Sequence, residues 1–484
     1  MSLDLSTMYK ANDNSFRCIE TETGNDMVIR EMFPIEEWDC PEAFKSVGIR
    51  GYEPMTAKEL ETEEQQDEKL NSSDEYIEEK FDGTRALVYF LAQECIESGE
   101  VVDSIGWCRV FSRRISKKTG FYVENSDSLP HIRELNRPEL VGTILDGEMF
   151  IEGLPFKEVA STLNCKWDKA LERQIEKGFV TFHAFDILFY HGVDLRKMPL
   201  ERRKVYLHLA VEEAKSEYIK EVEYFECGKI IGTDLYTEVM KRINPIDEDP
   251  YFDSLEDSKE SYPNLYKCWK EKLPLTPRAY YELIVSTGGE GVIIKPKKGK
   301  YLHKRGWEYS KIKSFLTREM IVLGFTEPTK EYTGKDVKKW GYWVRNKDNQ
   351  HMQGNFYGDT NYTPVTKNYY YNQVGNLILG VLMTNEEFSN IPKNKRGEVA
   401  NPSYYGLSEE YDTDYVIMEV CECSGFDDST REYFTRNENK MQGTVVEVKA
   451  NGIFKDTGKL RHPRYLRQRF DKSAEQCTWE DHIS

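Results

Sequence analysis

Several features are missing from the 484 residues of this chain, and each absence excludes a class of protein. No apolar run approaches the roughly eighteen residues of a membrane-spanning helix. The opening stretch MSLDLSTMYKANDNSF has neither the basic start nor the apolar segment of a signal peptide. The ten cysteines lack a CxxC…CxxC spacing, which favours reduced thiols over a zinc site or a disulfide framework. We therefore expect a cytoplasmic protein without a membrane partner.

A uniformly basic surface is also missing, because the net charge is −18. Taken alone, this charge argues against a nucleic-acid partner. The charge is regional, however. Residues 59–79 contain ten acids and one lysine, whereas residues 295–318 contain nine Lys or Arg and one acid, and residues 449–472 contain eight Lys or Arg and two acids. A nucleic-acid partner therefore remains compatible with the composition.

The length allows about two to four domains, each with its own core. Short β-rich runs recur between about 78 and 190, namely RALVYFLA, WCRVFS, TILDGEMFI and FVTFHAFDILFY. Residues 200–225 have helical periodicity, residues 246–275 are acidic and turn-rich and suggest an insertion or a loosely packed lobe, and residues 280–296 suggest a helix end, a Gly-rich turn and a strand. After Arg318 the pattern is of strands and turns, typical of an all-β domain such as a small barrel.

The segment EEKFDGTRALVYF, residues 78–90, places Lys80 at the start of a strongly apolar run. Lys80 is either one of several charges that flank a strand or a nucleophile held in a pocket. A lysine nucleophile needs a free amine, which cationic neighbours or desolvation supply by lowering the pKa of the ammonium. Arg85 follows across an Asp-Gly turn and is such a neighbour. The segment alone leaves both interpretations open.

Further motifs follow this segment in order. They are FSRR (111–114), LDGEMF (145–150), AFDILFY (184–190), EGVIIKP (290–296), YSKIKSF (309–315) and LRHPRYLRQRFDK (460–472). YEPMTAKEL (52–60), MPLERRK (198–204) and residues 445–472 add further matching segments. Together they resemble the ATP-dependent DNA ligases, within the covalent lysyl-nucleotidyltransferase superfamily, from about Pro54 to Lys472. The compact layout is most similar to viral or phage ligases.

The resemblance implies an α+β fold. It consists of a short extension (1–50), an adenylation domain of antiparallel, ATP-grasp-like sheets and helices (51–315, with an insertion around 205–275), and an OB-fold barrel (316–484). It also implies that Lys80 attacks the α-phosphate of ATP and carries AMP to the 5′-phosphate of a nick, which the 3′-hydroxyl then seals. The partner would be nicked double-stranded DNA, the enzyme a monomer, and the location the cytoplasm, that of the host for a viral protein, with the nucleus left open.

The same resemblance assigns roles to individual residues. Glu78 would read the adenine amino group and Phe185 would stack on the base. Arg85 and Arg113 would contact ribose and phosphate. Glu148 and Glu290 would lie near the sugar and bind Mg²⁺, with Glu148 also counted in the nucleotide site. The remaining residues expected around ATP are Lys295, Lys311, Lys313, Arg469 and Lys472.

Other interpretations remain at this point. An RNA ligase or an mRNA-capping guanylyltransferase would use the same lysyl-nucleotide chemistry, and a non-catalytic nucleic-acid-binding relative would have lost the nucleophile. Without the motifs, Phe185 would be a core aromatic, Glu148 a solvated turn acid, and Lys311 and Lys313 one face of a solvated edge strand. We expect no catalytic histidine and no NAD⁺-dependent chemistry. We expect two departures from the family pattern: Tyr309, where ligases usually carry Trp, and the lack of a large amino-terminal DNA-binding domain, since only some fifty residues precede YEPM.

Overall fold

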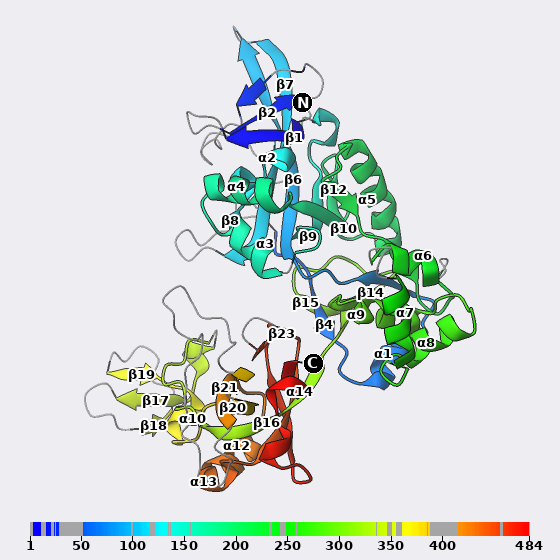
Figure 1. Ribbon diagram of the computed structural model, residues 1–484. Helices are drawn as coiled ribbons and strands as arrows, with labels where there is room; N and C mark the ends of the chain where they lie inside the picture. The colour runs from blue at the N-terminus through cyan, green and yellow to red at the C-terminus, as the bar shows by residue number, and fades with distance from the viewer. Residues whose placement is uncertain are drawn as a thin grey trace. The chain divides into compact units, whose positions relative to one another are not determined.

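Figure 1 shows a computed structural model of the chain, which divides into two compact units, Met1–Lys313 and Ser314–Ser484. The division lies two residues from the boundary at 315/316 that the sequence suggested. The structure describes residues 3–10, 16–20, 24, 26–28, 52–97, 100–115, 122–133, 135, 137–154, 156–231, 235–242, 248–257, 259–334, 336–345, 351–354, 361–384, 386–387, 415–454 and 458–483. Among the helices described, none combines the length and apolar character needed to span a membrane.

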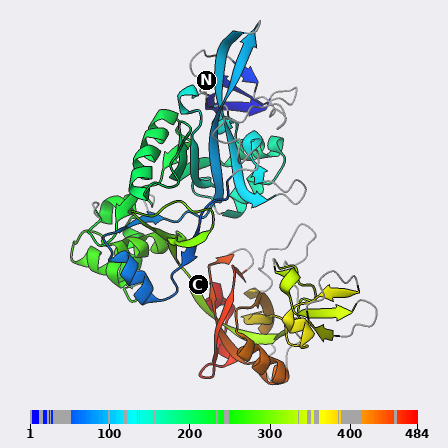
Figure 2. The same cartoon turned by 180° about the vertical axis from the view of Figure 1, so that it is seen from behind.

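The larger sheet of the first unit is built from the apolar runs that the sequence predicted as strands. Its order is β11-β10-β9-β6-β7-β8, and β12 pairs with β10. The strands are β6 (Thr84–Glu97), β7 (Glu100–Ile115), β8 (Tyr122–Glu124), β9 (Ile144–Phe150), β10 (Thr181–Tyr190), β11 (Val193–Asp194) and β12 (Ile219–Glu221). Helices α2 (Pro130–Arg133), α3 (Phe156–Leu163) and α5 (Leu200–Ala214) share its main apolar core. Both views show α5 along one side of this sheet (Figures 1 and 2).

A second sheet of the first unit has the order β13-β5-β14-β15-β4. Its strands are β4 (Thr56–Glu59), β5 (Glu75–Glu79), β13 (Tyr224–Glu226), β14 (Gly291–Pro296) and β15 (Arg305–Lys313). Its core is completed by residues of α1 (Glu63–Leu70), α6 (Leu235–Met240), α7 (Glu248–Asp257), α8 (Pro263–Lys270) and α9 (Pro277–Ser286). A separate apolar cluster joins the two sheets, with Leu87 and Leu188 from one side and Met55 and Tyr309 from the other. Residues 80–83 connect β5 to β6 and therefore cross from one sheet to the other.

Three expectations about local structure are corrected. The helix expected over 200–225 ends at Ala214, because Lys215 adopts a left-handed conformation with φ 46° and the chain then enters β12 and β13. The segment 246–275 is not loosely packed where it is described, since Leu255, Leu265 and Cys268 are buried in the second core. The short extension expected over residues 1–50, for which no strand was predicted, contains a three-stranded sheet, β1-β2-β3, formed by Leu3–Lys10, Phe16–Glu20 and Asp26–Val28.

The second unit contains a five-stranded sheet of order β21-β20-β16-β22-β25, antiparallel throughout. These strands lie in the part of the chain from about Arg318 onward, where the sequence predicts strands and turns: β16 (Leu316–Phe325), β20 (Leu377–Thr384), β21 (Tyr415–Cys423), β22 (Val445–Ala450) and β25 (Arg464–Arg469). Smaller sheets are made by β17 (Tyr342–Arg345), β18 (His351–Gln353) and β19 (Tyr362–Pro364), and by β23 (Ile453–Phe454) and β24 (Lys459–Leu460). The unit is not purely β, because α10 (Lys367–Tyr370), α12 (Asp428–Arg436), α13 (Glu438–Met441) and α14 (Trp479–Ile483) accompany the strands. The two units together are therefore a mixed fold of helices and sheets.

Candidate active site

The connection between β5 and β6 is fixed at both ends by the backbone. The Lys80 amide N–H donates to the carbonyl of Gly291 at 2.8 Å, which ties the connection to β14. A Cβ atom added at Gly83 would lie 2.3 Å from the Met149 carbonyl oxygen on β9, so only glycine allows this close approach. The K-x-D-G spacing thus places Lys80 where the two sheets meet.

The ammonium of Lys80 pairs with the carboxylate of Glu290, and the second oxygen of Glu290 lies 2.7 Å from Lys313 Nζ. The Lys80 and Glu290 side chains are 21% and 11% exposed, so solvent screens this pair only partly. Burial alone would raise the pKa of Glu290, but Lys80 and Lys313 outweigh it and hold that pKa below its ordinary value. The group paired with the Lys80 amine is thus an acid, and the expectation that Arg85 is a cationic neighbour of Lys80 stays a prediction.

Glu148 is half-buried on β9, directly across from Arg85 on β6. Burial raises the pKa of Glu148 to about 7, although Arg85 and Lys80 oppose the shift, and the nearby Glu290 charge raises it further. Two carboxylates that disfavour each other's ionisation are a suitable pair for a divalent cation, whose charge would relieve that repulsion. No group of three or more His, Cys, Asp or Glu side chains suited to a metal occurs within the described ranges.

The Arg85 guanidinium forms a bidentate ion pair with Asp146. Its Nε and Nη2 donate to the two carboxylate oxygens at 2.6 Å and 2.7 Å. Nη2 also donates to the Met55 carbonyl at 3.0 Å. Its central carbon lies 4.3 Å from the ring centroid of Phe185. Phe185 is half-buried rather than a core aromatic, and Lys295 Nζ lies 4.4 Å from the same ring. The ring is thus bordered by two cations.

Glu78 forms ion pairs with two buried lysines. Its oxygens lie 2.7 Å from Lys204 Nζ and 2.5 Å from Lys295 Nζ, and all three residues are no more than 2% exposed. Burial and the Lys204 charge lower the pKa of Lys295 to about 8, against the opposing effect of Glu78. Sequence reasoning missed Lys204. A usable sign was present, because Leu200, Lys204 and Leu207 share one helical face, and the two leucines mark that face as buried.

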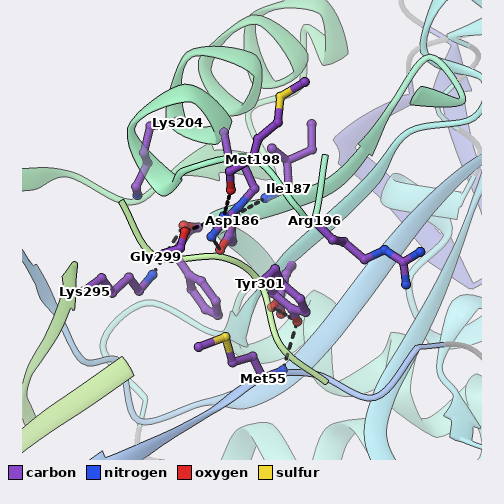
Figure 3. Close-up of polar contacts among 12 residues, drawn as sticks. Met55, Asp186, Ile187, Arg196, Met198, Lys204, Lys295, Gly299 and Tyr301 are labelled. Atoms are coloured by element: carbon purple, nitrogen blue, oxygen red, sulfur yellow. Dashed lines mark hydrogen bonds and ion pairs between the residues drawn. The ribbon is translucent and has the colours of Figure 1, made fainter. Parts of the chain in front are cut away.

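A second buried network supports the same region (Figure 3). The Arg203 guanidinium donates hydrogen bonds to the Asp186 carboxylate from Nε at 2.8 Å and from Nη2 at 2.9 Å. The Tyr309 hydroxyl also donates to Asp186. Burial works against ionisation of Asp186, yet Arg203 holds its pKa at about 2. Tyr309 stands where the family usually carries Trp, and its hydroxyl therefore has Asp186 as a hydrogen-bond partner. Arg203 and Asp186 were not predicted, because their pairing joins α5 to β10 and has no local sequence pattern.

The remaining predicted residues do not all gather here. Lys311 lies on β15, which is internal to its sheet, and its Nζ is 3.7 Å from Glu59, so the solvated-edge alternative is wrong. Arg113 is exposed on β7. Arg469 and Lys472 belong to the second unit, where both pair with Glu319 on β16. His183 packs against Phe81 and Phe150, and burial lowers its pKa to about 4, consistent with a structural histidine.

Comparison with known proteins identifies the class to which this region is similar. Residues 54–230 match the family model described as ATP dependent DNA ligase domain. The DNA ligases of Archaeoglobus fulgidus and Methanothrix thermoacetophila are 29% and 30% identical over 255 and 258 residues, which is 51% of this chain and 34% of each relative. The chain thus spans about a third of the length of these curated relatives. The resemblance inferred from the ordered motifs is confirmed by these matches.

Solved structures of ligases also match most of the chain. A Lig E DNA ligase, from a study of DNA binding with a minimal scaffold, is 16% identical over 86% of this chain and 98% of its own, with a TM-score of 0.42. The mycobacterial DNA ligase D complexed with ATP and MES is 15% identical over 88% and 98%, with a TM-score of 0.34. The ATP-dependent DNA ligase from bacteriophage T7, in complex with ATP, is 13% identical over 86% and 98%, with a TM-score of 0.34.

Proposed function

We propose that this chain is an ATP-dependent DNA ligase that seals nicks with a 5′-phosphate and a 3′-hydroxyl. The observation that carries the proposal is the Lys80–Glu290–Lys313 arrangement between two sheets, within or beside the segment that matches the ligase family. A partly buried amine with one acidic partner and further cations nearby suits attack on a phosphate.

The chemistry proceeds in three displacements. The Lys80 amine, once deprotonated, attacks the α-phosphorus of ATP, so that an N–P bond forms and the bond to the bridging oxygen breaks with release of pyrophosphate. The 5′-phosphate of the nick then displaces Lys80 from the AMP phosphorus. The 3′-hydroxyl finally attacks the 5′-phosphorus, forms the phosphodiester bond and releases AMP.

The site's cations and carboxylates support the binding of ATP and Mg²⁺. Lys313, Lys295 and Lys311 would offset the phosphate charge, while Glu148 and Glu290 would hold Mg²⁺ together with water. Mg²⁺ supplies charge neutralisation at the phosphates. Glu78 and the half-buried ring of Phe185 remain proposed for adenine. Although Lys204 and Lys295 form ion pairs with Glu78, Glu78 Oε1 has no hydrogen-bond partner among the described residues, which supports its accepting a hydrogen bond from the adenine amino group.

The second unit is proposed to be an OB-fold that acts on the same substrate. Its five-stranded antiparallel sheet and its basic β25 support that assignment. Arg469 and Lys472 would move from Glu319 to the pyrophosphate during the first step. We propose a monomer acting on nicked duplex, in the cytoplasm. The seven cysteines whose side chains are described are all free, which supports a reducing compartment.

A labelled-nucleotide experiment tests the proposal. With ATP labelled at the α-phosphate, we expect a covalent AMP adduct that a chase with nicked duplex DNA discharges into sealed product. Lys80→Ala should reduce the adduct at least 1,000-fold while leaving DNA affinity within about twofold, because the change removes the nucleophile alone.

Lys169→Ala, an exposed lysine on α4 (Trp167–Lys177), is the matched control and should form the adduct normally. An adduct that survives in Lys80→Ala would refute the assignment of the nucleophile. Labelling by GTP alone would instead support a capping guanylyltransferase, and transfer only to RNA ends would support an RNA ligase.

A further inference from the structure

Glu78 is paired with two buried lysines, although one would balance its charge. Lys295 on β14 approaches one carboxylate oxygen, with its Nζ 2.5 Å from Oε2. Lys204 on α5 approaches the other, with its Nζ 2.7 Å from Oε1, and it is 1% exposed. Figure 3 shows the two lysines extending from these two elements. Burial of the second ammonium sacrifices its hydration, which indicates a role for Lys204 beyond neutralising Glu78.

Neighbouring contacts hold Lys204 in a fixed position. The preceding residue, Arg203, anchors this turn of α5 to Asp186 through two hydrogen bonds, at 2.8 Å and 2.9 Å. Lys204 Nζ lies 4.4 Å from the ring centroid of Tyr224 on β13, a distance at which a cation is attracted to the ring. Tyr224 is the direct cross-strand partner of Glu78. The ammonium therefore contacts the Tyr224 ring and the Glu78 carboxylate at once.

The contact with Lys204 leaves hydrogen-bonding capacity open at the carboxylate. Glu78 Oε1 and Lys204 Nζ are both buried, and neither has a hydrogen-bond partner among the described residues, although the two atoms are 2.7 Å apart. Their contact is thus an ion pair without hydrogen-bond geometry. Because buried polar atoms in proteins are almost always hydrogen-bonded, the open Oε1 indicates a donor supplied by a bound molecule.

The Glu78 carboxylate lies beside the aromatic ring that is proposed to stack on the base. Lys295 Nζ is 2.5 Å from Glu78 and 4.4 Å from the ring centroid of Phe185. A base stacked on Phe185 would therefore have an edge near Glu78. An ionised carboxylate can only accept hydrogen bonds, so it favours an edge with an amino group, as in adenine, over one with a carbonyl oxygen, as in guanine.

We infer that Lys204 is a positioning residue for selection of the base. Its charge holds the Glu78 carboxylate ionised and in one orientation, and the lack of a hydrogen bond between them leaves Oε1 to accept one from the amino group of the base. Without Lys204, Lys295 would hold the carboxylate from one side, and the carboxylate would be free to turn Oε1 away from the base. This inference rests on the proposed ligase function and names a residue that sets its preference for adenine.

The test compares two nucleotides that differ in the amino group alone. Calorimetry with the full chain measures the affinities for AMP and for purine riboside 5′-monophosphate, which lacks that group. Neither can form the adduct, because neither carries pyrophosphate. The wild type should bind AMP about 10- to 100-fold more tightly, as expected for a hydrogen bond to a charged group.

In Lys204→Met this preference should fall to about threefold or less, through weaker binding of AMP and not through tighter binding of the analogue. Lys204→Gln also removes the charge and serves as a second variant with the same expectation. Lys204→Arg keeps the charge and should retain most of the preference. The matched control is Arg202→Met, which removes an exposed cation from the same helix and should retain the full preference.

Three outcomes would overturn the inference. The first is an unchanged preference for AMP in the variants without the charge. The second is an equal loss of affinity for both nucleotides, which would make Lys204 a purely structural residue. The third is a wild type that binds both nucleotides equally well.

Adduct formation with labelled ATP separates this inference from the proposed function. In Lys204→Met the KM for ATP should rise about 10- to 100-fold while the maximal rate changes much less, because Lys80 and the cations proposed for the phosphates are unaltered. A lower maximal rate with an unchanged KM would count against base selection. Absence of the adduct in the wild type would refute the ligase proposal, whereas the comparison of AMP with its analogue would still report on Lys204.

Discussion

Glu78 is the only acid in a buried group of three with Lys204 and Lys295. The group carries a net charge of +1 when both lysines are protonated, and burial already lowers the pKa of Lys295 to about 8. A buried ion pair adds little stability by itself, but removal of one partner leaves an uncompensated charge in a medium of low polarity. Removing the acid should therefore lower the free energy of unfolding much more than removing one of the lysines.

We predict that Glu78→Gln destabilises the first unit by about 3–5 kcal/mol, because it leaves two buried lysines without an anion. Lys204→Met should cost less, about 1–2 kcal/mol, because the Glu78–Lys295 pair that remains is neutral overall. Urea unfolding of both variants measures the difference, and the exposed control Lys166→Met should stay within about 0.5 kcal/mol of wild type. Equal losses for Glu78→Gln and Lys204→Met would contradict this account.

At the scale of elements, the end of α5 illustrates how tertiary contacts limit a helix. Residues 200–225 have helical periodicity, yet Ile219 pairs in parallel with Phe182 on β10. The helix must therefore stop, and it does so at Lys215 with φ 46° and ψ 47°. Arg137 Nε donates to the free carbonyl of Ala214 at 2.8 Å and completes the end. A non-glycine residue in this conformation carries strain of about 1 kcal/mol.

We predict that Lys215→Gly stabilises the first unit by about 0.5–1 kcal/mol, because glycine adopts the left-handed conformation without that strain. The same change at Lys220, an exposed residue within β12, should destabilise by a similar amount, since glycine weakens a strand. Thermal unfolding of both variants gives the comparison. A loss of stability in Lys215→Gly would show that the lysine stem, rather than the backbone, determines the end of the helix.

The difference between local sequence patterns and tertiary contacts also explains what could be predicted from the sequence. The strands β6, β9 and β10 follow from apolar runs, and the position of Lys80 follows from the K-x-D-G spacing, because both are local patterns. The partners of Lys80 and Arg85 do not follow from local patterns. Glu290 is 210 residues from Lys80 and Asp146 is 61 residues from Arg85, and only the register of the sheets brings them together. Helices α7 and α8 were missed because each has only a few buried positions, such as Leu255 and Leu265, and because α7 is strongly acidic.

At the scale of the whole molecule, the two cations of the second unit that are proposed to contact ATP are held by acids of that same unit. In the second unit Arg469 and Lys472 both pair with Glu319, and Arg469 also reaches Asp471 at 2.8 Å. These two cations are proposed to orient pyrophosphate in the first chemical step. Because the Glu319 carboxylate pairs with both cations, these two ion pairs must break before Arg469 and Lys472 can contact ATP. Glu319 would thus set part of the barrier to forming the adduct.

We predict that Glu319→Gln speeds formation of the AMP adduct about three- to tenfold. The effect should be modest, because ion pairs that solvent screens contribute little free energy each. Single-turnover labelling with ATP in the absence of DNA measures this step alone. Glu447→Gln is the matched control, because it frees only Arg467, 2.5 Å from Glu447 on the same sheet, and should leave the rate unchanged. A slower adduct in Glu319→Gln would mean that Glu319 positions Arg469 and Lys472 for the reaction instead of withholding them. Equal rates in both variants would mean that release of these cations does not limit the step.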